Sequence, residues 1–101
     1  KGWEIVPRIA ALIRTDHIFD KPSFGSEALV AVMKALAEKE PIAITLIGLC
    51  TDICVVSNAL LLKAALPEVR ISVDPACCAG VTPEKHAAAL ETLRSCQIQM
   101  N

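Results

Sequence analysis

The sequence contains no uninterrupted apolar stretch of the roughly 18 residues that a membrane-spanning helix requires, so we expect neither a transmembrane segment nor a membrane partner. It also lacks a surplus of one charge, because ten Lys and Arg stand against eleven Asp and Glu, a formal net charge of −1. This balance argues against nucleic acid as a partner, since domains that bind nucleic acid are usually strongly basic. A basic start, an apolar run and a small-residue cleavage site are also missing, so no secretory signal peptide is indicated.

An even set of cysteines is lacking as well. The five cysteines are Cys50, Cys54, Cys77, Cys78 and Cys96. Disulfide-stapled secreted domains usually carry an even number, and no Cys and His residues stand at the spacing of a zinc site. We therefore expect free thiols and a cytoplasmic location.

What is present is the composition of a folded chain. Apolar residues make up 53 % of the 101 residues and charged residues 21 %, which excludes an intrinsically disordered protein. The length allows one domain at most. The chain starts at Lys1 rather than Met, and its apolar content lies slightly above the usual range of about 45–50 %. Both features favour a part of a larger domain whose remainder would cover apolar faces.

Helical and strand patterns alternate along the chain. The patterns predict helices over Pro7–Arg14, about Ser26–Glu38, from Thr51 or Asp52 to about Leu66, and from Thr82 to about Ser95, with strands over His17–Phe19, Ile42–Ile47, Val69–Val73 and Gln97–Met100. Such alternation indicates βαβ units. The predicted fold class is therefore α/β, a Rossmann-like three-layer α/β/α arrangement with a parallel sheet.

Three of these segments have a specific expected environment. The run Ile42–Ile47 is apolar almost throughout, so we expect a strand buried on both faces. The helix that follows it is apolar on nearly every side and is expected in a core or against another subunit. Asp74-Pro75 is expected to end the third strand.

Ligands of open parallel sheets bind beyond the carboxyl ends of the strands, and Cys54 follows such a strand. It falls in the first turn of its predicted helix, where unpaired backbone N–H groups and the helix dipole favour a thiolate. A thiolate is a nucleophile, and the same N–H groups are suited to hold an oxyanion. The alternative is a cysteine that simply packs in the core.

Other candidates are weaker when taken alone. Lys21 stands at a strand end, where it is either a surface charge paired with Asp20 or a cation beside the Cys54 thiolate. His17 and His86 are expected to be exposed, and Trp3 to pack as an anchor or line a pocket.

The segment Gly48–Val55 (GLCTDICV) resembles the signature G-x-x-T-[DE]-x-C-V of the isochorismatase-like cysteine hydrolases, the superfamily that includes the nicotinamidases. The flanking segments agree with this resemblance. Asp20-Lys21 is similar to the lysine segment of the family, and Asp74–Ala79 is similar to its "D-A-C" strand end. Gly2-Trp3-Glu4 is similar to a short G-x-E stretch. The resemblance covers the whole chain, but only the C-terminal portion of a single family domain.

The resemblance implies roles for four residues. Cys54 would be the nucleophile and Lys21 the catalytic lysine, while the backbone N–H groups of Cys50 and Cys54 would form the oxyanion hole. The family has a cis peptide bond that maps to Leu49–Cys50. Its catalytic Asp, in a D-x-Q motif, has no counterpart here. Its Asp/His/His metal site also belongs to the other half, so no metal ligand is assigned and the cofactor stays unknown.

The family places two further strands between the lysine strand and the cysteine strand. Without them, we expect Lys21 and Cys54 on opposite sides of an empty slot and the chain alone to be inactive.

The predicted function is that of a cysteine hydrolase that cleaves the C–N bond of a small amide through a thioester, in a homo-oligomer. One alternative is a non-catalytic module for oligomer assembly, which would use the apolar helix Asp52–Leu66. A redox sensor at Cys77-Cys78 is a further alternative, disfavoured because a vicinal disulfide is strained.

Overall fold

The chain, seen in a computed structural model that describes residues 4–101, folds into one parallel sheet with helices. In chain order the elements are α1 (Pro7–Ala10), the 3-10 turn η1 (Thr15–His17), α2 (Glu27–Lys39), β1 (Ala43–Leu49), the π-helical turn η2 (Thr51–Val55), α3 (Val56–Ala65), β2 (Arg70–Ala79), α4 (Pro83–Ser95) and β3 (Gln99–Met100). The sheet has the order β1-β2-β3, and both strand pairs are parallel. The predicted α/β class with a parallel sheet is confirmed. Gly2 and Trp3, on which two expectations rest, lie outside the described residues.

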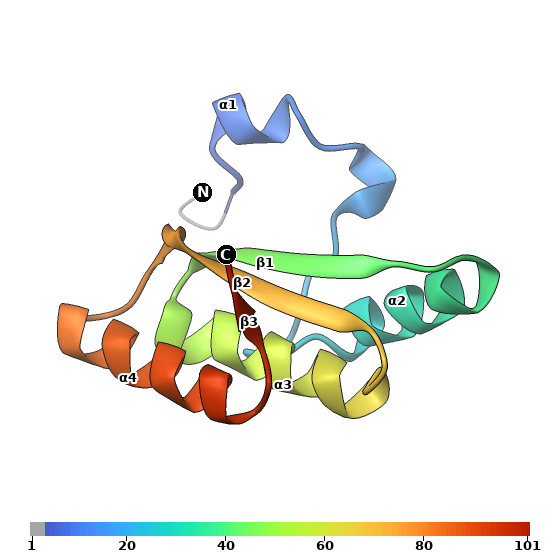
Figure 1. The fold of residues 1–101 in the computed structure, drawn as a ribbon. Helices are drawn as coiled ribbons and strands as arrows, with labels where there is room; N and C mark the ends of the chain where they lie inside the picture. The colour runs from blue at the N-terminus through green and yellow to red at the C-terminus, as the bar shows by residue number, and fades with distance from the viewer. Residues whose placement is uncertain (1–3) are drawn as a thin grey trace.

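The helices α3 and α4 cover one face of the sheet, and α1 and η1 lie on the opposite side (Figure 1). The core between sheet and helices consists of apolar side chains from both layers. Its buried members are Val55, Ala59, Leu62, Ile71, Val73, Leu90, Leu93 and Ile98. The helix α2 packs Leu29, Val30 and Met33 against the same core. No helix within residues 4–101 combines the length and the apolar character needed to cross a membrane.

Two helices begin at the residues that the sequence predicts. The Ser26 hydroxyl accepts a hydrogen bond from the Leu29 backbone N–H at 3.1 Å, and the Thr82 hydroxyl accepts one from Lys85 N–H at 3.1 Å. Each bond satisfies one of the backbone donors that a helix leaves unpaired at its start. These local bonds fix the starts of α2 and α4.

The expectation that the strand over Ile42–Ile47 is buried on both faces is wrong. Alternate residues of β1 are exposed, and the side chains of Ile47 and Leu49 are 62 % and 71 % exposed. The physical reason is that one face of β1 packs Ile44 and Leu46 against the core, whereas α1 and η1, on the opposite side, bury no residue and do not cover the other face. The strand therefore presents a row of uncovered side chains on that face.

The N-terminal segment differs from its prediction as well. The first helix ends at Ala10 rather than Arg14, and the predicted strand His17–Phe19 is not formed. Ile18 has extended backbone angles, but an extended segment becomes a strand only when its N–H and C=O groups pair with a neighbouring strand. In the described part of the chain this segment has no such neighbour.

The strand β2 continues through Asp74-Pro75 instead of ending there. The register passes from Leu46↔Val73 to Gly48↔Cys78, so β2 inserts extra residues opposite β1. Proline is tolerated at such an irregularity, because no ladder N–H is required of it. Across from the shift, Gly48 has a φ of +127°, a backbone angle that side-chain-bearing residues rarely adopt.

Candidate active site

The candidate site lies where β1 ends and η2 begins. The peptide bond between Leu49 and Cys50 is cis, at the position that the family resemblance implies. The Cys50 carbonyl accepts hydrogen bonds from the backbone N–H groups of Ile53 and Val55, both at 3.1 Å. Cys54 thus sits in a wide first turn directly after a strand. Such π-turns recur at functional sites in other proteins.

The structure brings Lys21 and Cys54 together. The Lys21 ammonium nitrogen lies 3.3 Å from Cys54 Sγ and 3.2 Å from the Ser23 carbonyl, to which it also donates. The expectation that an empty slot separates the two residues is therefore wrong. The reason is that the loop after Lys21 runs past β1 to the start of α2, beside α3 (Figure 1).

A buried amide that the sequence analysis missed fastens this loop. Asn58, only 8 % exposed, accepts a hydrogen bond from the Ser26 backbone N–H at 2.8 Å through Oδ1. Its Nδ2 donates to the carbonyls of Phe24, at 3.2 Å, and of Cys54, at 2.9 Å. The available signal was its place four residues after Cys54 on a largely apolar helix, since most buried polar side chains are hydrogen-bonded.

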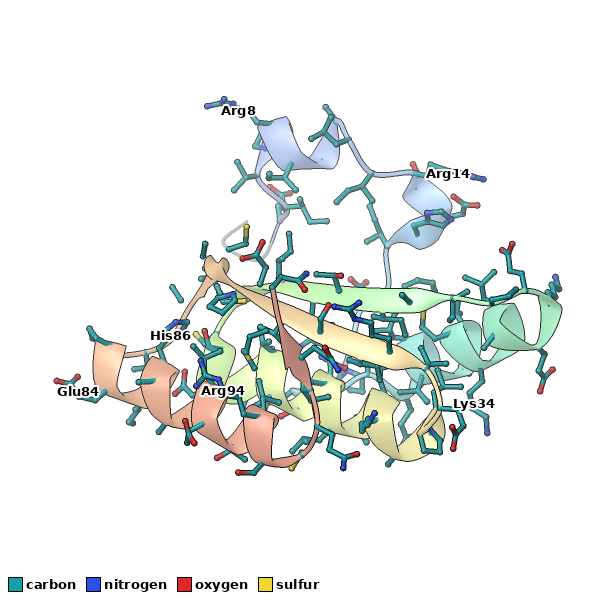
Figure 2. All side chains as sticks on the ribbon, in the orientation of Figure 1. Arg8, Arg14, Lys34, Glu84, His86 and Arg94 are labelled. Carbon is teal, nitrogen blue, oxygen red and sulfur yellow. The ribbon has the colours of Figure 1, made fainter. Side chains whose placement is uncertain are left out.

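The sequence predicts that Thr51 or Asp52 starts and caps this helix. Neither side chain caps it, because both have partners elsewhere. The fully buried Thr51 hydroxyl lies 2.7 Å from His86 Nδ1, and Asp52 Oδ1 accepts from the Val81 backbone N–H at 3.0 Å. Figure 2 shows His86 near the start of α4, beside the segment that joins β1 to α3. His86 is half-buried rather than exposed, whereas His17 is exposed as expected. These two bonds tie the cysteine turn to the first turn of α4, through His86, and to the loop before it, through Val81.

Gly80 provides the close approach that this arrangement needs. A Cβ at this position would lie 2.9 Å from the His86 backbone nitrogen and 3.0 Å from Asp52 Oδ1. We expect Gly80→Ala to lower the free energy of unfolding by about 1–3 kcal/mol, because overpacked backbone has to shift. Urea denaturation followed by circular dichroism measures this, with Ala79→Gly as the matched control beside it. A Gly80→Ala variant as stable as the parent would contradict the close packing.

The Cys77 thiol, near the end of β2, lies beside the Asp74 carboxylate. The negative charge of Asp74, aided by partial desolvation, by its hydrogen bond to the Cys77 thiol and by Cys78, raises the pKa of Cys77 above its ordinary value. The exposed Cys77 therefore holds less thiolate at neutral pH than an ordinary thiol.

We expect iodoacetamide at pH 8 to alkylate Cys77 more slowly than Cys96, which is also exposed, since only the thiolate reacts. Peptide mass spectrometry of timed samples gives both rates. Replacing Asp74 by Asn, which removes the charge, is expected to speed up Cys77. Equal rates at Cys77 and Cys96 in the parent protein would show that Asp74 does not act on this thiol.

Residues 4–101 bring no three His, Cys, Asp or Glu side chains together in a way that fits a metal ion.

The fold and the cysteine turn together define the class of protein. Solved structures share this α/β fold: the chain superimposes on the nicotinamidase from Bacillus subtilis with a TM-score of 0.77 at 27 % identity, over 98 % of this chain and 57 % of that one. A nicotinamidase from Staphylococcus aureus gives 0.74 at 22 % identity, over 93 % and 62 %. A pyrazinamidase from Pyrococcus horikoshii, solved in complex with zinc, gives 0.67 at 20 % identity, over 81 % and 45 %.

The family model "Isochorismatase domain" matches residues 1–100. The chain therefore belongs to the isochorismatase-domain family, as the resemblance of its cysteine segment implies. It spans about half the length of the solved enzymes it matches. No curated protein matches the sequence.

Proposed function

We propose that the protein is a hydrolase that cleaves the C–N bond of a small amide, with Cys54 as the nucleophile. The observation that carries the proposal is the 3.3 Å separation between Cys54 Sγ and the Lys21 ammonium nitrogen. A cation at this distance can stabilise the negative charge of a sulfur that reacts as a nucleophile. Membership of the family and the named activity of the enzymes with this fold support the same reading.

The chemistry proceeds in two halves. The Cys54 thiolate attacks the amide carbon, a C–S bond forms, and the carbonyl electron pair moves onto oxygen. Collapse of this oxyanion breaks the C–N bond, and the nitrogen leaves with a proton as ammonia. Water then adds to the thioester and the C–S bond breaks, so one amide and one water give one carboxylic acid and one ammonia.

The described residues have distinct parts in this scheme. The backbone N–H groups of Cys50 and Cys54 are the proposed donors to the oxyanion, a role that backbone amides at the start of a helix are suited to. The Lys21 ammonium holds the negative charge of the thiolate. A carboxylate base is still needed, and within residues 4–101 no carboxylate is hydrogen-bonded to Lys21 or Cys54. We therefore propose that these 101 residues alone do not complete turnover, and that a longer chain containing them, called the whole protein below, supplies the base.

A hollow beside Lys21, whose lining does not include Cys54, supports a small substrate. The hollow of about 760 Å³ is lined by Ile5, Ile18 and Phe19, together with Glu4, Ala10, Asp20 and Lys21. Apolar walls with a few polar groups are typical of sites for small organic molecules. A small aromatic amide such as nicotinamide is the first substrate to test. We place the protein in the cytoplasm, as a homo-oligomer, with neither nucleic acid nor a membrane as partner.

The test is a search for the acyl-enzyme. Whole protein is mixed with nicotinamide, quenched in acid within its first turnovers, and analysed by mass spectrometry. We expect a mass increase on the peptide that contains Cys54, which disappears on treatment with hydroxylamine, together with released ammonia. If the parent and the Cys54→Ala variant both release ammonia and neither carries an adduct, the proposed role of Cys54 is overturned.

A further inference from the structure

We propose that Asn58 is a positioning residue that holds the Lys21 ammonium against the Cys54 thiol. Its side chain bonds to both halves of the pair. One bond goes to the carbonyl of Cys54 itself, at 2.9 Å, and two go to the loop that carries Lys21, at Phe24 and Ser26. One buried side chain thus links the two catalytic candidates, which lie 33 residues apart in the sequence.

The loop needs such a link because its own bonds are short-range. The Lys21 ammonium donates to the Ser23 carbonyl, and the Ser23 hydroxyl donates to the Gly25 carbonyl at 3.0 Å. These bonds fold the loop upon itself but do not fix it to another element. Lys21 is exposed and has a long, flexible side chain, which loses much conformational freedom when it is held in one place.

Asn58 fixes the loop to another element, the helix α3. Ser26, which donates its N–H to Asn58, is the N-cap of α2 and is itself buried. The amide therefore fixes the point at which the loop enters α2 relative to the turn that bears the thiol. All the polar atoms of the Asn58 side chain act in these three bonds, and buried polar atoms of this kind are costly to leave unpaired. A smaller hydroxyl side chain cannot reach all three partners from the same helix position.

The geometry therefore predicts that the local charge at the thiol depends on Asn58. Iodoacetate carries a negative charge and iodoacetamide does not, although both alkylate a thiolate. The ratio of their rate constants at Cys54, followed by peptide mass spectrometry, thus reports a cation beside the sulfur. A unit charge about 4 Å away changes the energy of an anionic reagent by about 1 kcal/mol in water, which is about fivefold in rate.

The experiment compares whole-protein variants at one pH and low salt. In Lys21→Gln we expect the iodoacetate-to-iodoacetamide ratio to fall about fivefold. In Asn58→Ser and Asn58→Ala it is expected to fall to the same level, and Lys21→Gln added to either variant is expected to change it no further. The neighbouring Ser57→Ala, on the same helix, serves as control and should keep the parent ratio. If the Asn58 variants slow both reagents by the same factor, the iodoacetate-to-iodoacetamide ratio stays at the parent value. Asn58 would then have only a structural role, and the proposal would be overturned.

A measurement on the unmodified protein keeps the proposal testable even if the Asn58 variants fold poorly. Because Ser26 N–H donates to Asn58, we expect its hydrogen exchange to be slowed at least about a hundredfold relative to an open chain. Exchange at the open-chain rate would mean that the bond is not maintained, and would also overturn the proposal. Only the catalytic consequence of this positioning rests on the proposed function. Alkylation and exchange need no turnover, so failure of the amidase assay and failure of this inference are separate outcomes.

Discussion

Replacement of Cys54 by Ala is expected to abolish ammonia release from a small amide in the whole protein, with a loss of at least about a thousandfold in kcat. In the proposed scheme the covalent intermediate forms on the Cys54 sulfur, so its removal takes away the nucleophile. Cys54→Ser is expected to be nearly as inactive, since a hydroxyl beside an ammonium remains protonated. Initial rates of ammonia release at saturating substrate measure both effects.

The matched control is Cys96→Ser. Cys96 is an exposed free thiol that follows α4. Its replacement tests whether activity depends on Cys54 in particular or on the loss of any thiol. We expect parent activity in this variant and an unchanged melting temperature in all three. Substantial activity in Cys54→Ala would assign the chemistry to another nucleophile.

Replacement of Lys21 by Gln is expected to lower kcat by about 10²–10⁴-fold, the range typical of a group that stabilises charge or transfers a proton at the reacting atoms. The variant removes the ammonium that lies 3.3 Å from Cys54 Sγ while keeping a side chain of similar length. Lys21→Arg keeps the charge but spreads it over a planar group, so we expect only partial activity. Steady-state kinetics with separate kcat and KM give the answer.

Lys34, exposed on α2, is the control for a lost positive charge (Figure 2). Lys34→Gln should leave kcat within about twofold of the parent, since an exposed charge far from the reacting atoms is screened by solvent. If Lys21→Gln and Lys34→Gln behave alike, the contact between Lys21 and Cys54 has no catalytic meaning.

The features that the sequence predicted well depend on short-range chemistry. The caps at Ser26 and Thr82 need only a hydroxyl and an N–H three residues away, so they are visible in the local pattern. The parallel sheet follows from the alternation of strand and helix patterns, which confirms the α/β class. The cysteine segment is contiguous in sequence, so its place after β1 could also be predicted.

The features that sequence reasoning missed depend on long-range contacts. The continuation of β2 through Pro75 is set by its register against β1, which no local pattern contains. The buried Thr51 hydroxyl has a half-buried partner, His86, 35 residues away, and this contact takes the place of the expected capping role. The approach of Lys21 to Cys54 accompanies three hydrogen bonds of one buried amide, Asn58. A polar residue on an apolar helix is the sequence signal of such a contact, but it does not name the partner.

The uncovered face of β1 was also missed, because a local sequence pattern does not specify long-range contacts. The apolar run Ile42–Ile47 is typical of a strand buried on both sides, yet the side chains of alternate residues are exposed. The pattern records how apolar the strand is and does not specify how many of its faces are covered. In the described chain the helices cover only one.

The most direct test of the central claim is a titration of the whole protein with substoichiometric iodoacetamide. Each aliquot is assayed for ammonia release and digested, and the labelled fraction of each of the five cysteines is measured by mass spectrometry. The account predicts that Cys54 is labelled first and that activity falls in proportion to its labelled fraction, reaching zero at full labelling. Unchanged turnover in protein whose Cys54 is fully alkylated would contradict it.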